Sequence, residues 1–120
     1  MVRRRTIAAV TEVVPILRAK DAEASALWYA RLGFEVEWRH RFDEGMPLFI
    51  ALRNGRSRLF LSEHTGDAPG PALVYLFHDD VDAIAESFGR RAEPMPWGMR
   101  EVHLTDPDGN ALRVGAPAPQ

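Results

Sequence analysis

The sequence predicts an α+β fold in which two βαβββ modules pair and form curved mixed sheets around a cleft. Two helix-like segments are each preceded by one apolar segment and followed by three strand-like segments, so the same element order occurs twice. Each half is too small to bury its sheet alone, and the halves therefore need each other or a second copy. We expect one domain over residues 1–120, built from an N-terminal arm (1–9), a first module (10–64), a Gly/Pro-rich linker (65–71) and a second module (72–115).

The two helices are predicted from their ends and their apolar spacing. Asp21 can cap the first helix by accepting a hydrogen bond from an unpaired backbone N–H, and Gly33 is placed to end it in a left-handed conformation. Asp80 and Gly89 bound the second helix in the same way. The predicted buried stripe of the first helix consists of Ala24, Leu27, Trp28 and Leu32. The corresponding residues of the second helix are Val81, Ile84, Ala85 and Phe88.

The strand-like segments alternate with turn signals. In the first half they are residues 13–17, 34–42, 47–52 and 58–61, and in the second half 72–77, 92–95, 99–105 and 111–114. Asn54-Gly55 predicts a hairpin turn, and Pro107-Asp108-Gly109 predicts a second tight turn. The alternation after the first helix predicts that Phe34, Val36 and Trp38 share one face of their strand.

The composition excludes several classes of protein. The 120 residues include no cysteine, which removes disulfides, thiolate metal sites and cysteine nucleophiles. No apolar run approaches the ~20 residues that a membrane span needs. Fifteen basic residues against seventeen acidic ones give a net charge of −2, so we expect neither nucleic acid nor a membrane as a partner. The basic start, residues 1–5, has no cleavage site after it, and we therefore expect a cytoplasmic protein.

The histidines give no metal motif. They stand at positions 40, 64, 78 and 103, and none forms a pair at the spacing of a local zinc site. His103 alternates within a predicted strand and can face the cleft, where we interpret it as a hydrogen-bonding side chain. Residues 106–109 lack the third acidic position and the later glutamate of a calcium loop, so we predict a plain turn there.

Two tryptophans are candidates for contact with a ligand. Trp38 lies in a predicted strand, and Trp97 lies in the turn-like Pro96-Trp97-Gly98, where a large indole is hard to bury. An aromatic side chain held on a loop beside a concave sheet is a platform on which a flat ligand can stack. The alternative is that each indole fills a core or an interface, and the spacing leaves both interpretations open.

Several motifs resemble those of the vicinal oxygen chelate superfamily. They are, in chain order, Val14–Asp21, Trp28-Tyr29, Arg31–Phe34, Pro96–Gly98 with Arg100-Glu101, and Asp106–Asn110. The V-P-x-L start and the P-W-G-x-R-E stretch are most similar to the bleomycin resistance proteins within this superfamily. The resemblance covers residues 10–115.

The resemblance implies a strand-exchanged homodimer whose two clefts are shared between the subunits, with the exchange near Pro15. It also implies that a flat aromatic ligand is held between aromatics of both chains, which correspond here to Trp38 and Trp97. The expected ligand-binding residues are Trp38, Phe42, Phe49, Trp97, Gly98, Arg100, Glu101 and His103. The last three are expected to orient the ligand.

The superfamily also contains metal enzymes, among them glyoxalase I and extradiol dioxygenases, with ligands at four equivalent strand positions. By the resemblance, these positions are held here by Val14, Phe60, Leu73 and Arg113, none of which suits a hard divalent ion. We therefore expect no catalytic residue, no metal and no cofactor. The chain is also only weakly acidic, whereas bleomycin-binding relatives are strongly acidic, which points to a less cationic aromatic ligand.

The sequence thus predicts a metal-independent protein that sequesters a planar aromatic antibiotic of bleomycin type and so confers resistance. Its expected partners are that small molecule and a second copy of the chain. A metal-dependent enzyme of the glyoxalase or dioxygenase kind, acting on a small molecule, is the alternative. A third hypothesis is a protein that functions only through interaction, with its cleft filled by its own side chains.

Overall fold

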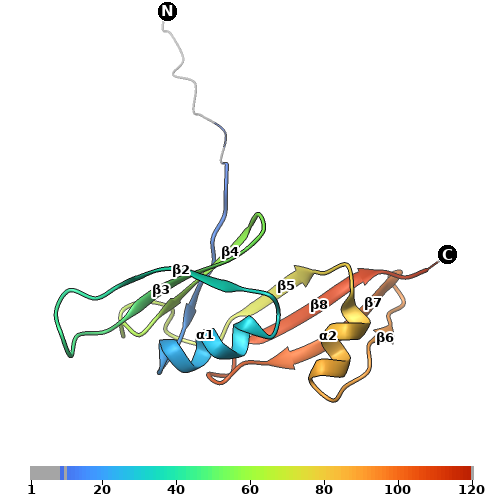
Figure 1. The fold of residues 1–120 in the computed structure, drawn as a ribbon. Coiled ribbons are helices and arrows are strands. Elements are labelled where there is room, and N and C mark those ends of the chain that lie inside the picture. The colour runs from blue at the N-terminus through green and yellow to red at the C-terminus, as the bar shows by residue number, and fades with distance from the viewer. Residues whose placement is uncertain (1–8, 10, 120) are drawn as a thin grey trace, which may run out of the picture.

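The computed structural model describes residue 9 and residues 11–119, and it contains two four-stranded sheets with one helix packed on each (Figure 1). The first module consists of β1 (Ile16–Arg18), α1 (Ala22–Ala30), β2 (Glu35–His40), β3 (Phe49–Asn54) and β4 (Ser57–Ser62). The second module consists of β5 (Leu73–Phe77), α2 (Val81–Ser87), β6 (Glu93–Pro94), β7 (Met99–Thr105) and β8 (Ala111–Pro117). The predicted α+β class and the repeated βαβββ order are confirmed.

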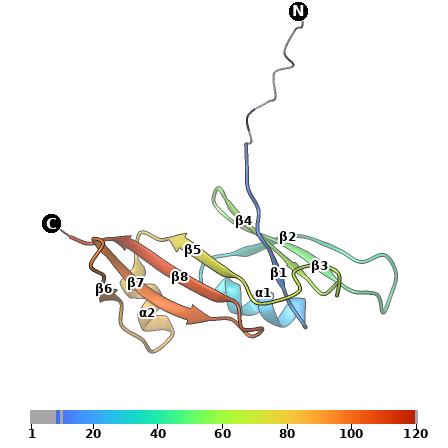
Figure 2. The ribbon, with the colours of Figure 1, turned by 180° about the vertical axis from the view of Figure 1, so that it is seen from behind.

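The two sheets have the same topology. Their strand orders are β1-β4-β3-β2 and β5-β8-β7-β6. In each sheet the first strand of the module runs parallel to the fourth, and the other neighbours are antiparallel. Both helices lie in front of the sheets in Figure 1 and behind them in Figure 2. We call the side covered by the helices the helix face and the other side the open face.

The helix faces hold the apolar core. Its members on the strands are Leu17, Ile50, Leu52, Leu59 and Leu61 in the first module, and Val102, Leu104, Leu112 and Val114 in the second. Fully burying one such side chain stabilises the fold by about 1.5–3 kcal/mol. Because successive side chains of a strand alternate, the residues between these core positions lie on the open face. The open faces are therefore where side chains stay available to a ligand or to a second chain.

Both helices begin and end as the sequence predicts. The Asp21 carboxylate accepts a hydrogen bond from the Ala24 backbone N–H at 3.1 Å, and Gly33 has a φ of +91° just beyond α1. Asp80 caps α2 in the same way, accepting from the Ala83 N–H at 3.0 Å.

The predicted apolar stripe of α1 is partly wrong. Ala24 and Leu27 are exposed, and the buried residues of the helix are Ala22, Ser25, Ala26 and Tyr29. The helix is apolar on most of its circumference, so helical spacing fits more than one side. Trp28 is half-buried, and its ring packs against Phe88 with centroids 5.3 Å apart.

The turn between β7 and β8 joins the second module to the first. Asp106 is buried, and its Oδ2 accepts a hydrogen bond from the Tyr29 hydroxyl of α1 at 2.6 Å. The Asn110 side-chain amide donates to the Arg18 carbonyl at 3.0 Å. The predicted turn is confirmed, since the Gly109 N–H donates to the Asp106 carbonyl at 3.1 Å. We call the contacts of Asp106 and Asn110 with Tyr29 and Arg18 the module clamp.

A β-bulge in β2 shows that the predicted face of Trp38 is wrong. Val36 lies opposite Leu52 and Trp38 lies opposite the preceding residue of β3, so Glu37 is an extra residue in the strand. An extra residue of this kind shifts the alternation beyond it. Phe34 and Val36 pack with the core on the helix face, whereas Trp38 lies on the open face.

Most of the predicted N-terminal arm, residues 1–9, lies outside the described residues. At Pro15 the chain is joined to the first sheet, because the Pro15 carbonyl accepts a hydrogen bond from the Phe60 N–H at 2.9 Å. In the part of the chain that the structure describes, no helix has the length and apolar character needed to cross a membrane.

Candidate ligand-binding site

An aromatic cluster lies on the open face of the first sheet. Trp38 of β2 stacks on Phe49 of β3, with ring centroids 5.8 Å apart and planes inclined by 14°. Phe60 of β4 lies 5.7 Å from Trp38 and 5.3 Å from Phe49. Centroid separations of about 4.5–7 Å are favourable for aromatic pairs. We call these three residues the Trp38 cluster.

A hollow of about 600 Å³ opens beside the Trp38 cluster. It is lined by Trp38, His40, Pro47, Phe49 and residues 64–67. Trp38 remains 41% exposed, so its indole is accessible to a ring that enters the hollow. Phe42, in the loop after β2, is exposed and lies with its ring centroid 5.3 Å from that of His40.

A buried carboxylate organises the open face of the second sheet. Glu101 of β7 is 1% exposed, and three other side chains bond to its two oxygens. Oε2 accepts from the Tyr75 hydroxyl at 2.8 Å and from the Trp97 indole N–H at 2.9 Å. Oε1 lies 2.9 Å from Nε2 of His103. We call these four residues the Glu101 cluster.

The local sequence makes room for the Glu101 cluster. Glu101 lies opposite Gly115 of β8, and Tyr75 reaches Glu101 from β5, on the other side of β8. A Cβ atom on Gly115 would overlap the Tyr75 hydroxyl and lie 3.2 Å from the Cγ atom of Glu101. The close approach of these side chains therefore requires glycine at position 115.

Hydrogen bonds set the protonation of Glu101 and Tyr75. Burial by itself would raise the pKa of Glu101, but the hydrogen bonds from His103, Trp97 and Tyr75 outweigh burial and hold that pKa below its usual value. Desolvation and the bond to Glu101 raise the pKa of Tyr75 to about 12. At neutral pH Glu101 is therefore an anion, and Tyr75 is a neutral hydrogen-bond donor.

The structure brings most of the expected site residues to the open faces. Trp38 and Phe49 lie on the first sheet, with Phe42 in the loop beside them. Glu101 and His103 lie on the second sheet, with Trp97 and Gly98 in the turn before β7. Trp97 is 61% exposed although its N–H is bonded to Glu101. Arg100 points to the helix face, where its Nε lies 3.0 Å from Asp82 of α2, so the structure does not bring it to the cleft.

The residues expected from the sequence did not include two aromatic residues of β5 that lie on the open face. Tyr75 and Phe77 lie on the open face with ring centroids 5.0 Å apart, and Phe77 is 76% exposed. The alternation of Leu73, Tyr75 and Phe77 along the predicted strand was a signal for them, because every second side chain points to the same face. Phe60, expected only at a metal-ligand position, belongs to the Trp38 cluster.

The four positions that the resemblance associates with a metal carry unsuitable side chains. Val14 and Leu73 are aliphatic, Phe60 is aromatic and Arg113 is a cation, so none offers the carboxylate or imidazole donor that a divalent ion requires. Within residues 9 and 11–119, no group of three or more His, Cys, Asp or Glu side chains is arranged to hold a metal ion. The residues at these positions do not fit a metal cofactor.

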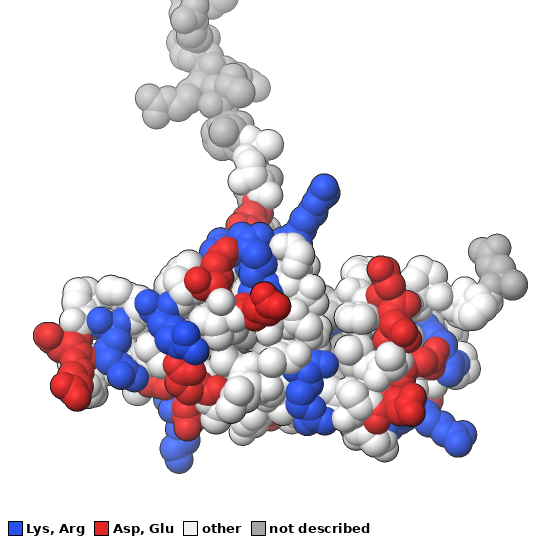
Figure 3. Space-filling view, in the orientation of Figure 1, with Lys and Arg blue, Asp and Glu red and all other residues white. Residues whose placement is uncertain are grey.

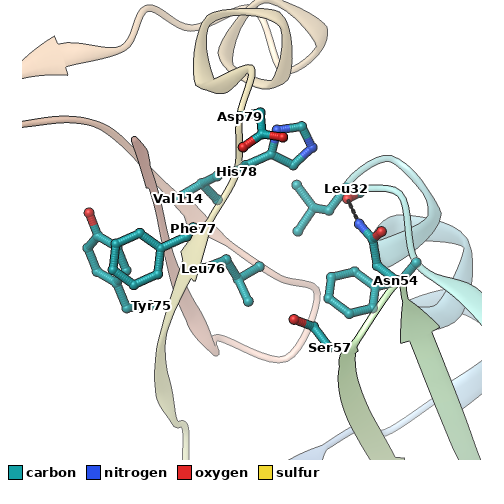
Figure 4. A pocket seen from close by; sticks show the side chains of 10 residues that line it. Leu32, Asn54, Ser57, Tyr75, Leu76, Phe77, His78, Asp79 and Val114 are labelled. Carbon is teal, nitrogen blue, oxygen red and sulfur yellow. Dashed lines mark hydrogen bonds between the residues drawn. The ribbon is translucent and has the colours of Figure 1, made fainter. Parts of the chain in front are cut away.

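A second pocket, of about 350 Å³, lies between the modules (Figure 4). It is lined by Leu32, Phe34, Asn54 and Ser57 of the first module, and by residues 75–79 and Val114 of the second. The Asn54 amide donates to the Leu32 carbonyl at 3.1 Å, so this polar group is already used within the fold. The rings of Tyr75 and Phe77 lie on the other side of the β5 ribbon from Leu76 (Figure 4). The open faces, with their exposed aromatics, are therefore the better candidates for the site.

Charges are mixed on the surface. Basic and acidic side chains are interspersed on the face shown in Figure 3. On the first sheet Glu37 bonds to Arg53, with Nε and Oε2 2.6 Å apart, and also to Arg58. Arg58 lies in addition 3.4 Å from a Glu12 carboxylate oxygen. These pairs compensate much of the charge that the first sheet presents.

Comparisons with known proteins identify the family and the fold of the chain. The model of a family described as glyoxalase superfamily protein matches residues 4–117. A search of curated proteins gives no significant match. Among solved structures, a bleomycin resistance determinant encoded on the transposon Tn5 is 27% identical, with a TM-score of 0.68 over 90% of this chain and 98% of that chain.

Two further solved structures have the same fold. The bleomycin-binding protein of Streptomyces verticillus, complexed with copper(II)-bleomycin, is 26% identical, with a TM-score of 0.62 over 95% of this chain and 100% of that chain. The lactoylglutathione lyase of Agrobacterium tumefaciens is 22% identical, with a TM-score of 0.65 over 89% of this chain and 94% of that chain. The last likeness concerns the fold alone.

Proposed function

Since the chain belongs to the glyoxalase superfamily, whose family model spans residues 4–117, we propose that within this family it is a binding protein and not a metal enzyme. It holds a planar aromatic antibiotic of bleomycin type by stacking, and it confers resistance by sequestering that compound. No bond of the ligand is made or broken. The observation that carries this proposal is the exposed Trp97 indole fixed to the buried Glu101 carboxylate.

Trp97 is well suited to receive a flat ring. Its hydrogen bond to Glu101 fixes the orientation of the indole, while most of the ring stays accessible. A side chain that is already ordered loses less conformational freedom on binding, so more of the contact energy becomes affinity. The likeness to a bleomycin resistance determinant and to a bleomycin-binding protein, at 27% and 26% identity, supports an aromatic ligand of this type.

The proposed cleft is shared between two copies of the chain. The Trp38 cluster and the Glu101 cluster belong to different sheets, and no helix of the described residues covers either open face. Exposed apolar side chains on one face, such as Phe77, are typical of a surface that contacts another molecule. When the first sheet of one copy faces the second sheet of the other, Trp38 and Trp97 form opposite walls. Exchange of the N-terminal strand near Pro15 is part of this proposal.

A titration with bleomycin, with and without copper, followed by tryptophan fluorescence tests the proposal. Trp28 packs against Phe88 and gives a constant background, while Trp38 and Trp97 report a stacked ligand. We expect saturable quenching at one ligand per chain. Trp97→Ala should weaken binding by about 2–4 kcal/mol, the scale of a central interface tryptophan, and Trp97→Phe should weaken it less because a ring remains.

The control for this titration is Leu27→Ala, which changes an exposed apolar residue of α1 and should leave the affinity unchanged. A flat response at high micromolar ligand would remove bleomycin as the ligand. An unchanged affinity of Trp97→Ala would show that the ring binds elsewhere.

A metal-dependent enzyme of the same superfamily is the alternative function. The side chains of Val14, Phe60, Leu73 and Arg113 argue against it, because they offer no suitable metal donor. Elemental analysis of freshly purified protein separates the two functions, and one divalent ion per chain would contradict our proposal. The third hypothesis requires that side chains of the protein fill the cleft. The hollow beside Trp38 argues against it, because space remains there.

A further inference from the structure

Arg113 occupies the centre of the open face of the second sheet. It is exposed and lies on β8, the strand between β5 and β7. The strand register places Tyr75 on one side of it and His103 on the other. Along β8 its neighbours on the same face are Ala111 and Gly115, which are both small. These neighbours leave the guanidinium open to an incoming molecule.

The neighbours of Arg113 do not compensate its charge. The Tyr75 hydroxyl and the Nε2 of His103 both bond to Glu101, and the Trp97 indole N–H also donates a hydrogen bond to that carboxylate. Within the part of the chain that the structure describes, Arg113 takes part in no salt bridge. Its positive charge therefore remains available on the open face.

Arginines on the open face of the first sheet are in a different situation. Arg53 and Arg58 both bond to the Glu37 carboxylate. Arg18 donates to the His64 carbonyl at 3.3 Å. Arg113 is therefore the better placed of these arginines to bind an anion from outside the chain.

The surroundings of Arg113 are aromatic. Tyr75 and Phe77 lie beside it with ring centroids 5.0 Å apart, and Trp97 is fixed on the same face. A guanidinium binds a carboxylate through two parallel hydrogen bonds, and its planar geometry matches that group. A ligand with a flat ring and an acidic group could stack on the aromatic side chains and pair with the Arg113 guanidinium at the same time. A cationic ligand would instead meet a like charge in the middle of the sheet.

We propose that Arg113 binds an acidic group of the ligand, so that this cleft prefers planar aromatic carboxylates over neutral or cationic compounds of the same shape. The inference rests on the proposed function, because it takes the open face of the second sheet as part of the ligand-binding surface. It makes the preferred ligand less cationic than bleomycin, in line with the weakly acidic composition of the chain. By the resemblance, Arg113 stands where metal enzymes of the superfamily hold a metal ligand. Here that position supplies a fixed positive charge of its own.

Calorimetric titration of the full chain with three matched compounds tests this inference. The compounds share one ring and differ in charge: 2-naphthoate, 2-naphthamide and 2-naphthylmethylammonium. We expect 2-naphthoate to bind about tenfold to a hundredfold more tightly than 2-naphthamide, the range of one charge-assisted hydrogen-bonding contact. In Arg113→Gln this advantage should disappear, while the affinity for 2-naphthamide should stay within about twofold.

The matched control is Arg56→Gln, which removes the same charge from the exposed turn between β3 and β4. It should keep the preference for 2-naphthoate. Equal binding of 2-naphthoate and 2-naphthamide by the unchanged protein would overturn the role of Arg113 and leave aromatic binding intact. An equal loss in both variants would also overturn it, because the effect would then come from net charge. Failure of all three compounds to bind at millimolar concentration would overturn both this inference and the proposed aromatic site.

Discussion

At the scale of single residues, one carboxylate holds three side chains of the second sheet in place. The Glu101 carboxylate accepts hydrogen bonds from the Tyr75 hydroxyl of β5, from the Trp97 indole in the turn before β7, and from His103 of its own strand. The pKa of Glu101 lies below its usual value because these hydrogen bonds outweigh burial. The orientation of Trp97 therefore depends on the charge of a residue that is itself almost inaccessible.

This dependence predicts how acid and Glu101→Gln change the protein. The Glu101 pKa is lower in the folded chain than in the unfolded one, so the carboxylate stabilises the fold fully above about pH 4.5 and this contribution is lost as the pH falls through the lowered value. Glu101→Gln should reduce the free energy of unfolding by about 1–3 kcal/mol at neutral pH, since a neutral amide accepts these donors less well.

Urea unfolding between about pH 7 and about pH 3 checks this prediction. The variant should lose less stability on acidification than the unchanged protein, and its Trp97 emission should already differ at neutral pH. Parallel pH profiles for the two proteins would contradict the assigned role of Glu101.

The sequence could show only part of this arrangement. Strand alternation accounts for the common face of Glu101 and His103, which the structure joins by a hydrogen bond. The burial of Glu101 comes from Tyr75, which is 26 positions away, and from the space that Gly115 leaves. Contacts between distant strands of this kind are not encoded in the local pattern of either strand. The same alternation puts Arg100 on the opposite face of β7, so this local signal could have excluded it from the cleft; only its bond to Asp82, 18 positions away, is not local.

At the scale of elements, α1 and the turn between β7 and β8 act as one unit through the module clamp. Tyr29→Phe removes one hydroxyl and leaves the buried Asp106 carboxylate with one fewer donor. We expect the free energy of unfolding to fall by about 2 kcal/mol, the scale of a hydrogen bond to a charged group. Urea unfolding measures the change, with the exposed Leu27→Ala as a control that should shift stability by less than about 0.5 kcal/mol. Equal effects of the two substitutions would show that the clamp adds no stability.

The helices, the turns and the order of elements along the chain could be predicted because their signals are local, whereas the order of the strands within each sheet was not predicted. The Asp21 and Asp80 caps, the helix-ending Gly33 and the last turn all act within a few residues of their own position. The face of Trp38 could not be predicted, because one extra residue in β2 changes the side on which every later side chain lies. A bulge is specified by the pairing with β3, and the sequence of β2 does not reveal it.

At the scale of the whole molecule, the two open faces predict self-association. Phe77 lies exposed on the open face of the second sheet. In the proposed dimer this residue is covered, so Phe77→Glu should place a charge in the interface and separate the subunits. Light scattering after size exclusion should give twice the 13.5 kDa chain mass for the unchanged protein and the single chain mass for the variant.

Leu27→Glu is the matched control for this measurement, because Leu27 is equally apolar and exposed but lies on α1. It should leave the dimer intact. A monomeric unchanged protein at micromolar concentration would contradict the shared cleft, and the two aromatic surfaces would then have to bind separately.

The overall architecture followed from the sequence because the same order of elements occurs twice. Two modules of the same element order, each too small to bury its sheet alone, have few ways to form a common core. The contacts that join the two modules could not be predicted from local patterns, because Tyr29 and Asp106 are 77 positions apart. The shared cleft stays a prediction that the mass measurement tests.

The module clamp also has a consequence for the order of events during synthesis. The partners of Tyr29 and Arg18 are Asp106 and Asn110, which are synthesised 77 and 92 positions later. Until then α1 has no acceptor for its buried hydroxyl, and the first module lacks part of its native support. Contacts between distant positions are slow to form and leave apolar surface exposed in the meantime. We therefore expect the nascent first module to be accessible to chaperones and proteases until Asp106 and Asn110 have been synthesised.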